Sequence, residues 1–87
     1  MSEQEVFEVV CKHLTTIVPT IPKESVVHDA SMRDLGASSL DIVEVVSCSM
    51  RELRVRVPRA ELQGLKNIGQ LVALLHKTGA GGANAPR

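Results

Sequence analysis

The first part of the chain shows apolar residues at the spacing of an amphipathic α-helix. These apolar positions are Val6, Val9, Val10, Leu14, Ile17 and Val18. Residues three or four apart share one face of a helix, so the repeat predicts a helix with one buried face. Ser2 followed by Glu5 has the form of a capping box, which satisfies free N–H groups at a helix start. We therefore expect a helix over about residues 3–18, ended by Pro19.

Residues 19–38 show no sustained period but contain scattered apolar side chains. These are Ile21, Val26, Val27, Met32 and Leu35. The pattern predicts a long connection that is pinned to the core at intervals, with Ser31 and Asp34 placed to close a short turn. Long connections are uncommon in small domains and often carry function.

The second half of the chain predicts three further helical segments. Residues 39–54, SLDIVEVVSCSMRELR, form the second helix, whose inward face is expected to be Ile42, Val45, Val46 and Leu53. Pro58 opens a short helical turn through about Gln63, closed by Gly64. The last helix runs from Asn67 to a stop at Gly79, with Ile68, Leu71, Val72 and Leu75 on its apolar face.

These elements predict an all-α fold, a four-helix bundle of three main helices and a short third helix, with a long first loop. One domain is expected over residues 1–78, followed by a flexible glycine-rich tail over residues 79–87. A chain of 87 residues has room for a single modest core, and with Phe7 as its one aromatic residue that core must be aliphatic.

Charge and cysteine content exclude several classes of partner and site. Ten basic residues balance ten acidic ones, which argues against nucleic acid or an anionic membrane as a partner. Cys11 and Cys48 lack the spacing of a zinc motif or a disulfide scaffold, so we expect no metal site and a reducing cytoplasm. The N-terminus lacks the positive charge of a signal peptide, and no stretch reaches transmembrane length.

The adjacent serines at the start of the second helix have different expected roles. Ser38 is followed three residues later by Asp41, a pattern that predicts Ser38 as the N-cap. Ser39 is then the first helical residue, with its side chain facing solvent at a helix end that carries free N–H groups and about half a positive charge. A phosphate ester on Ser39 would be favoured there, and Gly36 leaves room for an approaching enzyme. The alternative is an ordinary solvated serine.

Residues 34–46, DLGASSLDIVEVV, resemble the acyl carrier protein family, whose signature is Leu-Gly-x-Asp-Ser-Leu at the start of the second helix. The resemblance covers about residues 3–77. It implies that a phosphopantetheinyl transferase attaches 4′-phosphopantetheine from coenzyme A to Ser39. The family's usual Asp before the serine is Ser38 here, which keeps the cap but removes a negative charge that modifying enzymes often meet.

A carrier of this kind needs a mobile thiol and no catalytic residue of its own. Cys11 and Cys48 lie within the predicted helices among apolar residues, where cysteine usually acts as a small buried apolar residue. The resemblance implies that the prosthetic arm supplies the thiol, which raises the effective concentration of the acyl group at partner active sites.

The second helix has a second apolar row, formed by Leu40, Val43 and Met50. The family resemblance makes this side of the helix the expected docking surface for partner enzymes. The residues expected to form this surface are Leu40, Asp41, Val43, Glu44, Met50 and Arg51. The alternative is that the row, Val43 in particular, is core covered by the long loop. Ser49 falls on the inward side, where it would leave space or bond back to a helix carbonyl.

A run of arginines follows the centre of this helix and departs from strongly acidic fatty-acid carriers. The run consists of Arg51, Arg54, Arg56 and Arg59, with Glu52 as its acidic neighbour. A solvated mixed-charge surface is the alternative meaning of such a run. We expect a discrete, monomeric carrier of polyketide or mixed polyketide-peptide biosynthesis, whose partners are acyl-loading and acyl-processing enzymes such as a ketosynthase or acyltransferase.

Three other functions stay open from the sequence. An enzyme would need Ser39 as nucleophile and His28 or another histidine as base, but no nucleophile elbow accompanies them. An adaptor with the carrier fold that is never modified is a second alternative. A carrier that is loaded with an amino acid rather than an acyl group is a third.

Overall fold

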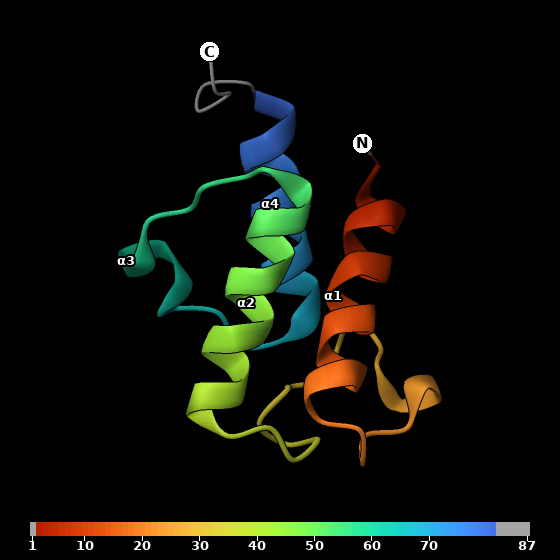
Figure 1. The fold of residues 1–87 in the computed structure, drawn as a ribbon. Coiled ribbons are helices and arrows are strands. Elements are labelled where there is room, and N and C mark those ends of the chain that lie inside the picture. The colour runs from red at the N-terminus through yellow and green to blue at the C-terminus, as the bar shows by residue number, and fades with distance from the viewer. Residues whose placement is uncertain (1, 82–87) are drawn as a thin grey trace.

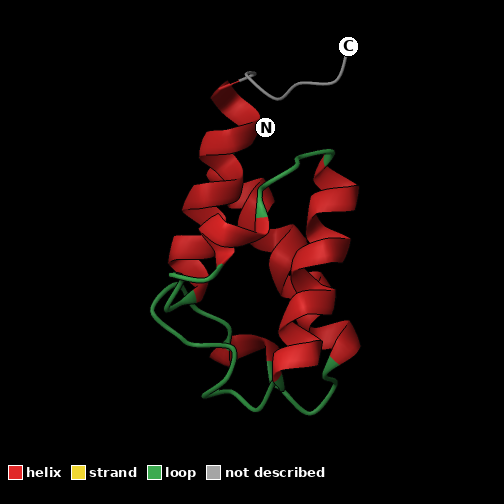
Figure 2. Ribbon diagram, turned by 90° about the vertical axis from the view of Figure 1, so that its left-hand side faces the viewer, coloured by secondary structure: helices red, strands yellow, loops and turns green. Residues whose placement is uncertain are grey.

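The computed structural model describes residues 2–81, which form four α-helices and one short 3-10 helix. The helices are α1 (Glu3–Ile17), α2 (Ser39–Leu53), α3 (Arg59–Leu62) and α4 (Ile68–Gly81), and the 3-10 helix η1 spans Lys23–Ser25. The described residues contain no strand, so the predicted all-α fold is confirmed (Figure 2). None of the described helices is long and apolar enough to cross a membrane.

The three long helices lie side by side, and α3 stands apart beyond α2 (Figure 1). Helix α1 runs in the opposite direction to α2 and α4, and it packs against both. The long connection between α1 and α2 lies at the end of the bundle opposite the start of α1 (Figure 2). This end is where α2 begins.

Local hydrogen bonds explain where the helices start. Ser2 and Glu5 form the predicted capping box of α1, with the Glu5 N–H donating to Ser2 Oγ at 3.1 Å. At the start of α4 the Gln70 N–H donates to Asn67 Oδ1 at 2.8 Å.

Helix α4 continues through Gly79 to Gly81, so the predicted stop at Gly79 is wrong. One glycine costs a helix only about 1 kcal/mol, which is too little to end it. Residues 82–87 of the predicted tail lie outside the described residues.

The core is aliphatic. It draws side chains from the long helices, from the connection between α1 and α2, and from the connection between α2 and α3. Its fully buried apolar members are Val6, Val10, Leu14, Val45, Ile68, Leu71, Val72 and Leu75. From the long loop, Ile21, Val26 and Met32 are buried as predicted, whereas Val27 is half exposed and does not pin the loop. The one-residue step from Val26 to Val27 in this extended segment turns the second valine outward.

Two backbone hydrogen bonds join the long loop to the start of α4. Ile68 N–H donates to the Ala30 carbonyl at 2.9 Å, and Gly69 N–H donates to the His28 carbonyl at 2.7 Å. On the other side of this segment, the His28 ring stacks on Phe7 of α1 with ring centroids 4.5 Å apart. The loop is therefore held between α1 and α4, which sets the path by which it reaches α2.

Candidate functional site

Ser38 is fully occupied in capping α2. Its Oγ accepts a hydrogen bond from the Asp41 N–H at 3.1 Å, and the Asp41 carboxylate accepts one from the Ser38 N–H at 3.0 Å. This reciprocal pair is the predicted capping box. The N–H and the Oγ of Ser38 are both engaged in the cap, so this serine has a structural role.

Ser39 is the first residue of α2, and it is exposed to solvent. The N–H groups of the first helical turn have no partner within the helix, so the surroundings of the Ser39 hydroxyl are electropositive. Gly36 adopts a left-handed φ of +116°, and an added Cβ there would meet no heavy atom within 4 Å. The space around Gly36 itself is therefore open, and the predicted approach of an enzyme past it stays a prediction.

Arg33 contacts the same hydroxyl, a feature that the sequence analysis missed. Its Nη2 donates a hydrogen bond to Ser39 Oγ at 3.0 Å. The two residues are six positions apart across an irregular loop, and no periodicity relates such positions. The only signal available in the sequence was a cationic side chain shortly before the helix start.

These residues fit a phosphate ester. The hydroxyl that would carry it is exposed, the helix start favours an anion by about 0.3–1 kcal/mol, and a guanidinium already lies at hydrogen-bond distance. The phosphodiester of a phosphopantetheine arm would therefore meet the positive charge of the Arg33 guanidinium and of the helix start.

The outward face of α2 carries two exposed apolar side chains close to Ser39. Leu40 is 80% exposed and Val43 is 55% exposed, so the alternative that the long loop buries Val43 is wrong. Met50 differs from them because it is half-buried and packs against the core. Its carbonyl accepts a hydrogen bond from the Val55 N–H at 3.0 Å, so the chain leaving α2 folds back beside Met50.

The charged residues of α2 divide between the two ends of the helix. Asp41 is partly exposed near the start, Glu44 is exposed one turn later, and Arg51 is exposed in the last turn. Arg54 caps the end of the helix in the left-handed conformation, with φ 58° and ψ 43°. Apart from Glu52, the carboxylates of α2 therefore lie in its first half and the arginines lie at its far end, as the sequence pattern indicates.

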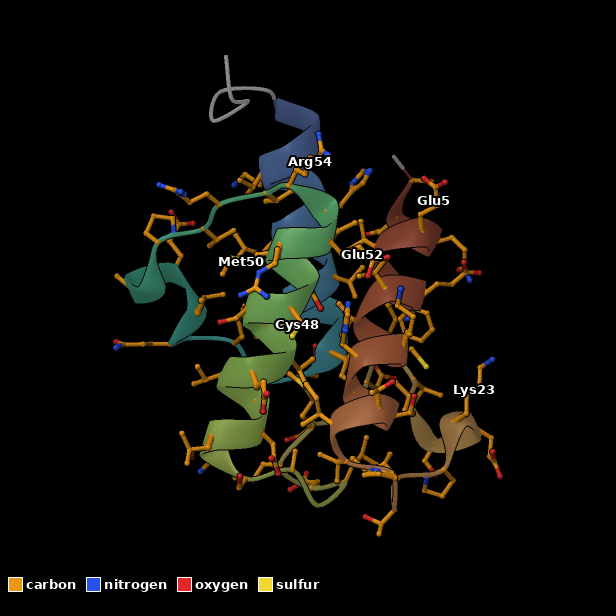
Figure 3. All side chains as sticks on the ribbon, in the orientation of Figure 1. Glu5, Lys23, Cys48, Met50, Glu52 and Arg54 are labelled. Carbon is orange, nitrogen blue, oxygen red and sulfur yellow. The ribbon has the colours of Figure 1, made fainter. Side chains whose placement is uncertain are left out.

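Glu52 does not neutralise these arginines, because its side chain points from α2 toward α1 (Figure 3). Its carboxylate accepts a hydrogen bond from Lys12 Nζ at 2.8 Å and lies 2.8 Å from His13 Nε2. The hydrogen bond from Lys12, followed by that from His13, lowers the pKa of the Glu52 carboxyl. Arg51 and Arg54 form no ion pair with a carboxylate within residues 2–81.

Ser49 and Cys48 lie in the second half of α2 and differ in burial. Ser49 is completely buried, and its Oγ has no hydrogen-bond partner, so the predicted bond back to a helix carbonyl is not formed. Cys48 is half-buried, and Cys11 on α1 is buried.

Within the described part of the chain, no group of three or more His, Cys, Asp or Glu side chains is arranged to hold a metal ion.

Comparison with known proteins assigns the family. Residues 8–75 match the family described as phosphopantetheine attachment site. The chain is 32% identical over 76 residues to the polyketide biosynthesis acyl-carrier-protein AcpK of Bacillus subtilis, covering 87% of this chain and 93% of that protein. It is 36% identical over 75 residues to an acyl carrier protein of Saccharopolyspora erythraea, covering 85% of this chain and 78% of that protein.

A solved structure agrees with these relatives. The fold is similar, with a TM-score of 0.76 and 32% identity, to a chain in the crystal structure of the curacin biosynthetic pathway HMG synthase in complex with acetyl donor-ACP. The match covers 85% of this chain and 95% of that chain. The exposed serine at the start of α2, the helical bundle and these relatives lead to one conclusion: this chain belongs to the acyl carrier proteins, which bear a phosphopantetheine arm.

Proposed function

We propose that Ser39 carries the 4′-phosphopantetheine arm and that this carrier serves polyketide biosynthesis. The observation that carries the proposal is the contrast between the two exposed serines: the Oγ and N–H of Ser38 are both engaged in the cap of α2, whereas the Ser39 hydroxyl takes no part in the cap and accepts a hydrogen bond from the Arg33 guanidinium. The polyketide assignment is supported by the polyketide biosynthesis relative, which is 32% identical to this chain over 93% of the relative's length.

Attachment requires a transferase and coenzyme A, because the chain itself supplies only the acceptor hydroxyl. The Ser39 oxygen forms a bond to the phosphorus on the pantetheine side of the pyrophosphate of coenzyme A. The pyrophosphate P–O bond breaks, and its other phosphate leaves as part of adenosine 3′,5′-bisphosphate. The serine proton goes to a base of the transferase or to solvent. The arm supplies a terminal thiol that holds acyl groups as thioesters, so the carrier needs no catalytic residue and is not itself an enzyme.

The cargo we propose is a short acyl group that is passed to a condensing enzyme. The support is the structural neighbour, which is an acetyl donor bound to an HMG synthase.

The carrier acts as a monomer in the cytoplasm, an environment that suits its free thiols at Cys11 and Cys48.

Partner enzymes dock on the outward face of α2, near the root of the arm. Leu40 and Val43 offer a small apolar contact, Asp41 and Glu44 border it, and Met50 contributes its exposed part. Arg51 adds positive charge at the far end. A small apolar centre with a charged rim suits brief and specific encounters.

Intact-mass measurement tests the attachment site. The protein is incubated with coenzyme A and a broad-range phosphopantetheinyl transferase, and the expected result is a mass gain of one phosphopantetheine group. Ser39→Ala must abolish the gain, while the matched variant Ser38→Ala must retain it. A gain that persists in Ser39→Ala means that the arm is attached at another residue and contradicts the proposal. No gain in the natural sequence also contradicts it and favours an unmodified adaptor.

Acyl transfer tests the cargo and the docking surface. The arm is installed from acetyl-coenzyme A, and loss of the acetyl group to an HMG-synthase-type enzyme is followed by mass. Leu40→Asp should lower the rate about tenfold, a typical loss for a central contact residue, whereas Val27→Asp, at another exposed apolar side chain, should not. Equal effects of the two substitutions contradict docking through α2. If an amino-acid-activating enzyme attaches an amino acid to the arm, and the acetyl group is not transferred, the protein is a peptidyl carrier.

A further inference from the structure

We infer that Arg33 binds the phosphodiester of the prosthetic arm and so fixes the direction in which the arm leaves the protein. This inference rests on attachment at Ser39. Arg33 is exposed, and its Nη2 donates to Ser39 Oγ at 3.0 Å. Within residues 2–81 the Arg33 guanidinium forms no ion pair with a carboxylate. Its positive charge is therefore available to an anion placed on Ser39.

The chemistry of the two groups matches. A guanidinium has five N–H donors in a planar fork, and the contact to Ser39 uses one of them. A phosphodiester on Ser39 carries a negative charge at neutral pH, and each of its non-bridging oxygens is only two bonds from Oγ. These oxygens fall within reach of the same guanidinium, which forms shorter and stronger hydrogen bonds to an anion than to a neutral hydroxyl.

The backbone around Arg33 is held in place before any arm is attached. The preceding residue, Met32, is buried, and its carbonyl accepts a hydrogen bond from the Ala37 N–H at 3.0 Å. The Arg33 carbonyl accepts one from the Gly36 N–H, also at 3.0 Å. Ala37 is buried as well. The turn thus anchors Arg33 from both sides, and only its side chain must adjust.

The position of Arg33 gives the arm a direction. A phosphodiester held by Arg33 would lie on the side of Ser39 from which the Arg33 guanidinium approaches, that is, toward the loop before α2. The exposed side chains of Leu40 and Val43 on α2 then stay free to contact a partner enzyme while the arm reaches its active site. Arg33 acts as a positioning residue, because it touches the root of the arm and not the thioester.

Phosphorus NMR of the modified protein tests this inference. The natural sequence, Arg33→Gln and the control Arg51→Gln are each modified and weighed, so that a failure of attachment at Ser39 is seen first as a missing mass gain. The expected result is a phosphodiester resonance whose chemical shift differs between the natural sequence and Arg33→Gln. Salt should move the resonance in the natural sequence and in Arg51→Gln, but not in Arg33→Gln, because added ions weaken the pair.

A second measurement needs no substitution. The side-chain N–H signals of Arg33 are compared before and after modification, and they should shift more than those of Arg51. One result overturns the inference although attachment has succeeded: unchanged Arg33 signals, together with the same phosphorus shift and salt response in Arg33→Gln as in the natural sequence.

Discussion

His13 on α1 and Glu52 on α2 are joined by a contact of 2.8 Å between the imidazole Nε2 and the carboxylate Oε1. Lys12 approaches the same carboxylate at 2.8 Å, so one glutamate of α2 meets two side chains of α1. Figure 3 shows Glu52 on the side of α2 that faces α1. The cluster joins these two helices at a level far from Ser39, which is at the opposite end of α2.

Substitution of Glu52 by Gln should make the stability of the bundle less sensitive to acid. The Glu52 pKa is lowered from its ordinary value of 4.5, first by Lys12 and then by His13. A pKa that is lower in the folded state contributes stability above pH 4.5, and this contribution is lost as the pH falls through the folded value. Urea unfolding at neutral pH and below pH 4.5 should show the difference between the two proteins shrinking in acid. A difference that does not depend on pH, or an equal effect of Glu44→Gln, contradicts this assignment.

Substitution of Ser38 by Ala should lower the free energy of unfolding by about 1 kcal/mol, the usual cost of losing an N-cap. Ser38→Thr keeps the hydroxyl and should recover most of the loss. Ser39→Ala should leave stability nearly unchanged, because its hydroxyl is exposed and makes no cap. Thermal and urea unfolding of the unmodified proteins checks this order. Equal losses for the two alanine variants would mean that the cap is shared between the serines.

Substitution of Ser49 by Ala should raise the free energy of unfolding by about 1 kcal/mol. The Ser49 hydroxyl is completely buried without a hydrogen-bond partner, and such a group costs free energy that alanine does not. Ser47 on the same helix is exposed and provides the control. Ser47→Ala should gain only the helix-propensity difference of about 0.5 kcal/mol or less. A loss of stability in Ser49→Ala would show that the hydroxyl has a partner in solution, such as a buried water.

Substitution of Arg54 by Gly should stabilise the unmodified protein by about 1 kcal/mol. Arg54 has a positive φ of 58°, a conformation that costs residues with a Cβ about 1–2 kcal/mol and glycine almost nothing. Arg51→Gly, in the regular last turn of α2, should instead destabilise by about 1 kcal/mol. Unfolding by urea distinguishes the two. Should both substitutions destabilise, the Arg54 side chain must make a stabilising contact that outweighs the backbone cost.

Substitution of Gly69 by Ala should lower the free energy of unfolding by about 1 kcal/mol, although alanine is the better helix former. A Cβ on Gly69 would lie 3.0 Å from the His28 carbonyl oxygen and 3.2 Å from the His28 Cβ. That carbonyl also accepts the Gly69 N–H at 2.7 Å, so it cannot move freely. Gly64→Ala is the control, because its Cβ would meet nothing within 4 Å. Gly64→Ala should be neutral or slightly stabilising, and a stabilising Gly69→Ala would show that the long loop yields easily.

The sequence by itself determined the helix starts, most of the buried faces and the distinction between the two serines. These features depend on interactions between residues three or four positions apart, such as the capping boxes of Ser2 with Glu5 and of Ser38 with Asp41. The spacing of apolar residues likewise reports burial along each helix, and it failed at Val27, where the chain is irregular.

Only the tertiary structure decided which distant side chains meet. The contact of Arg33 with Ser39 depends on the path of an irregular loop, and that path is set by hydrogen bonds to α4 and by the stacking of His28 on Phe7. The exposure of Val43 depends on how far that loop covers α2. Such contacts arise when whole elements pack against one another, and no local period in the chain encodes them.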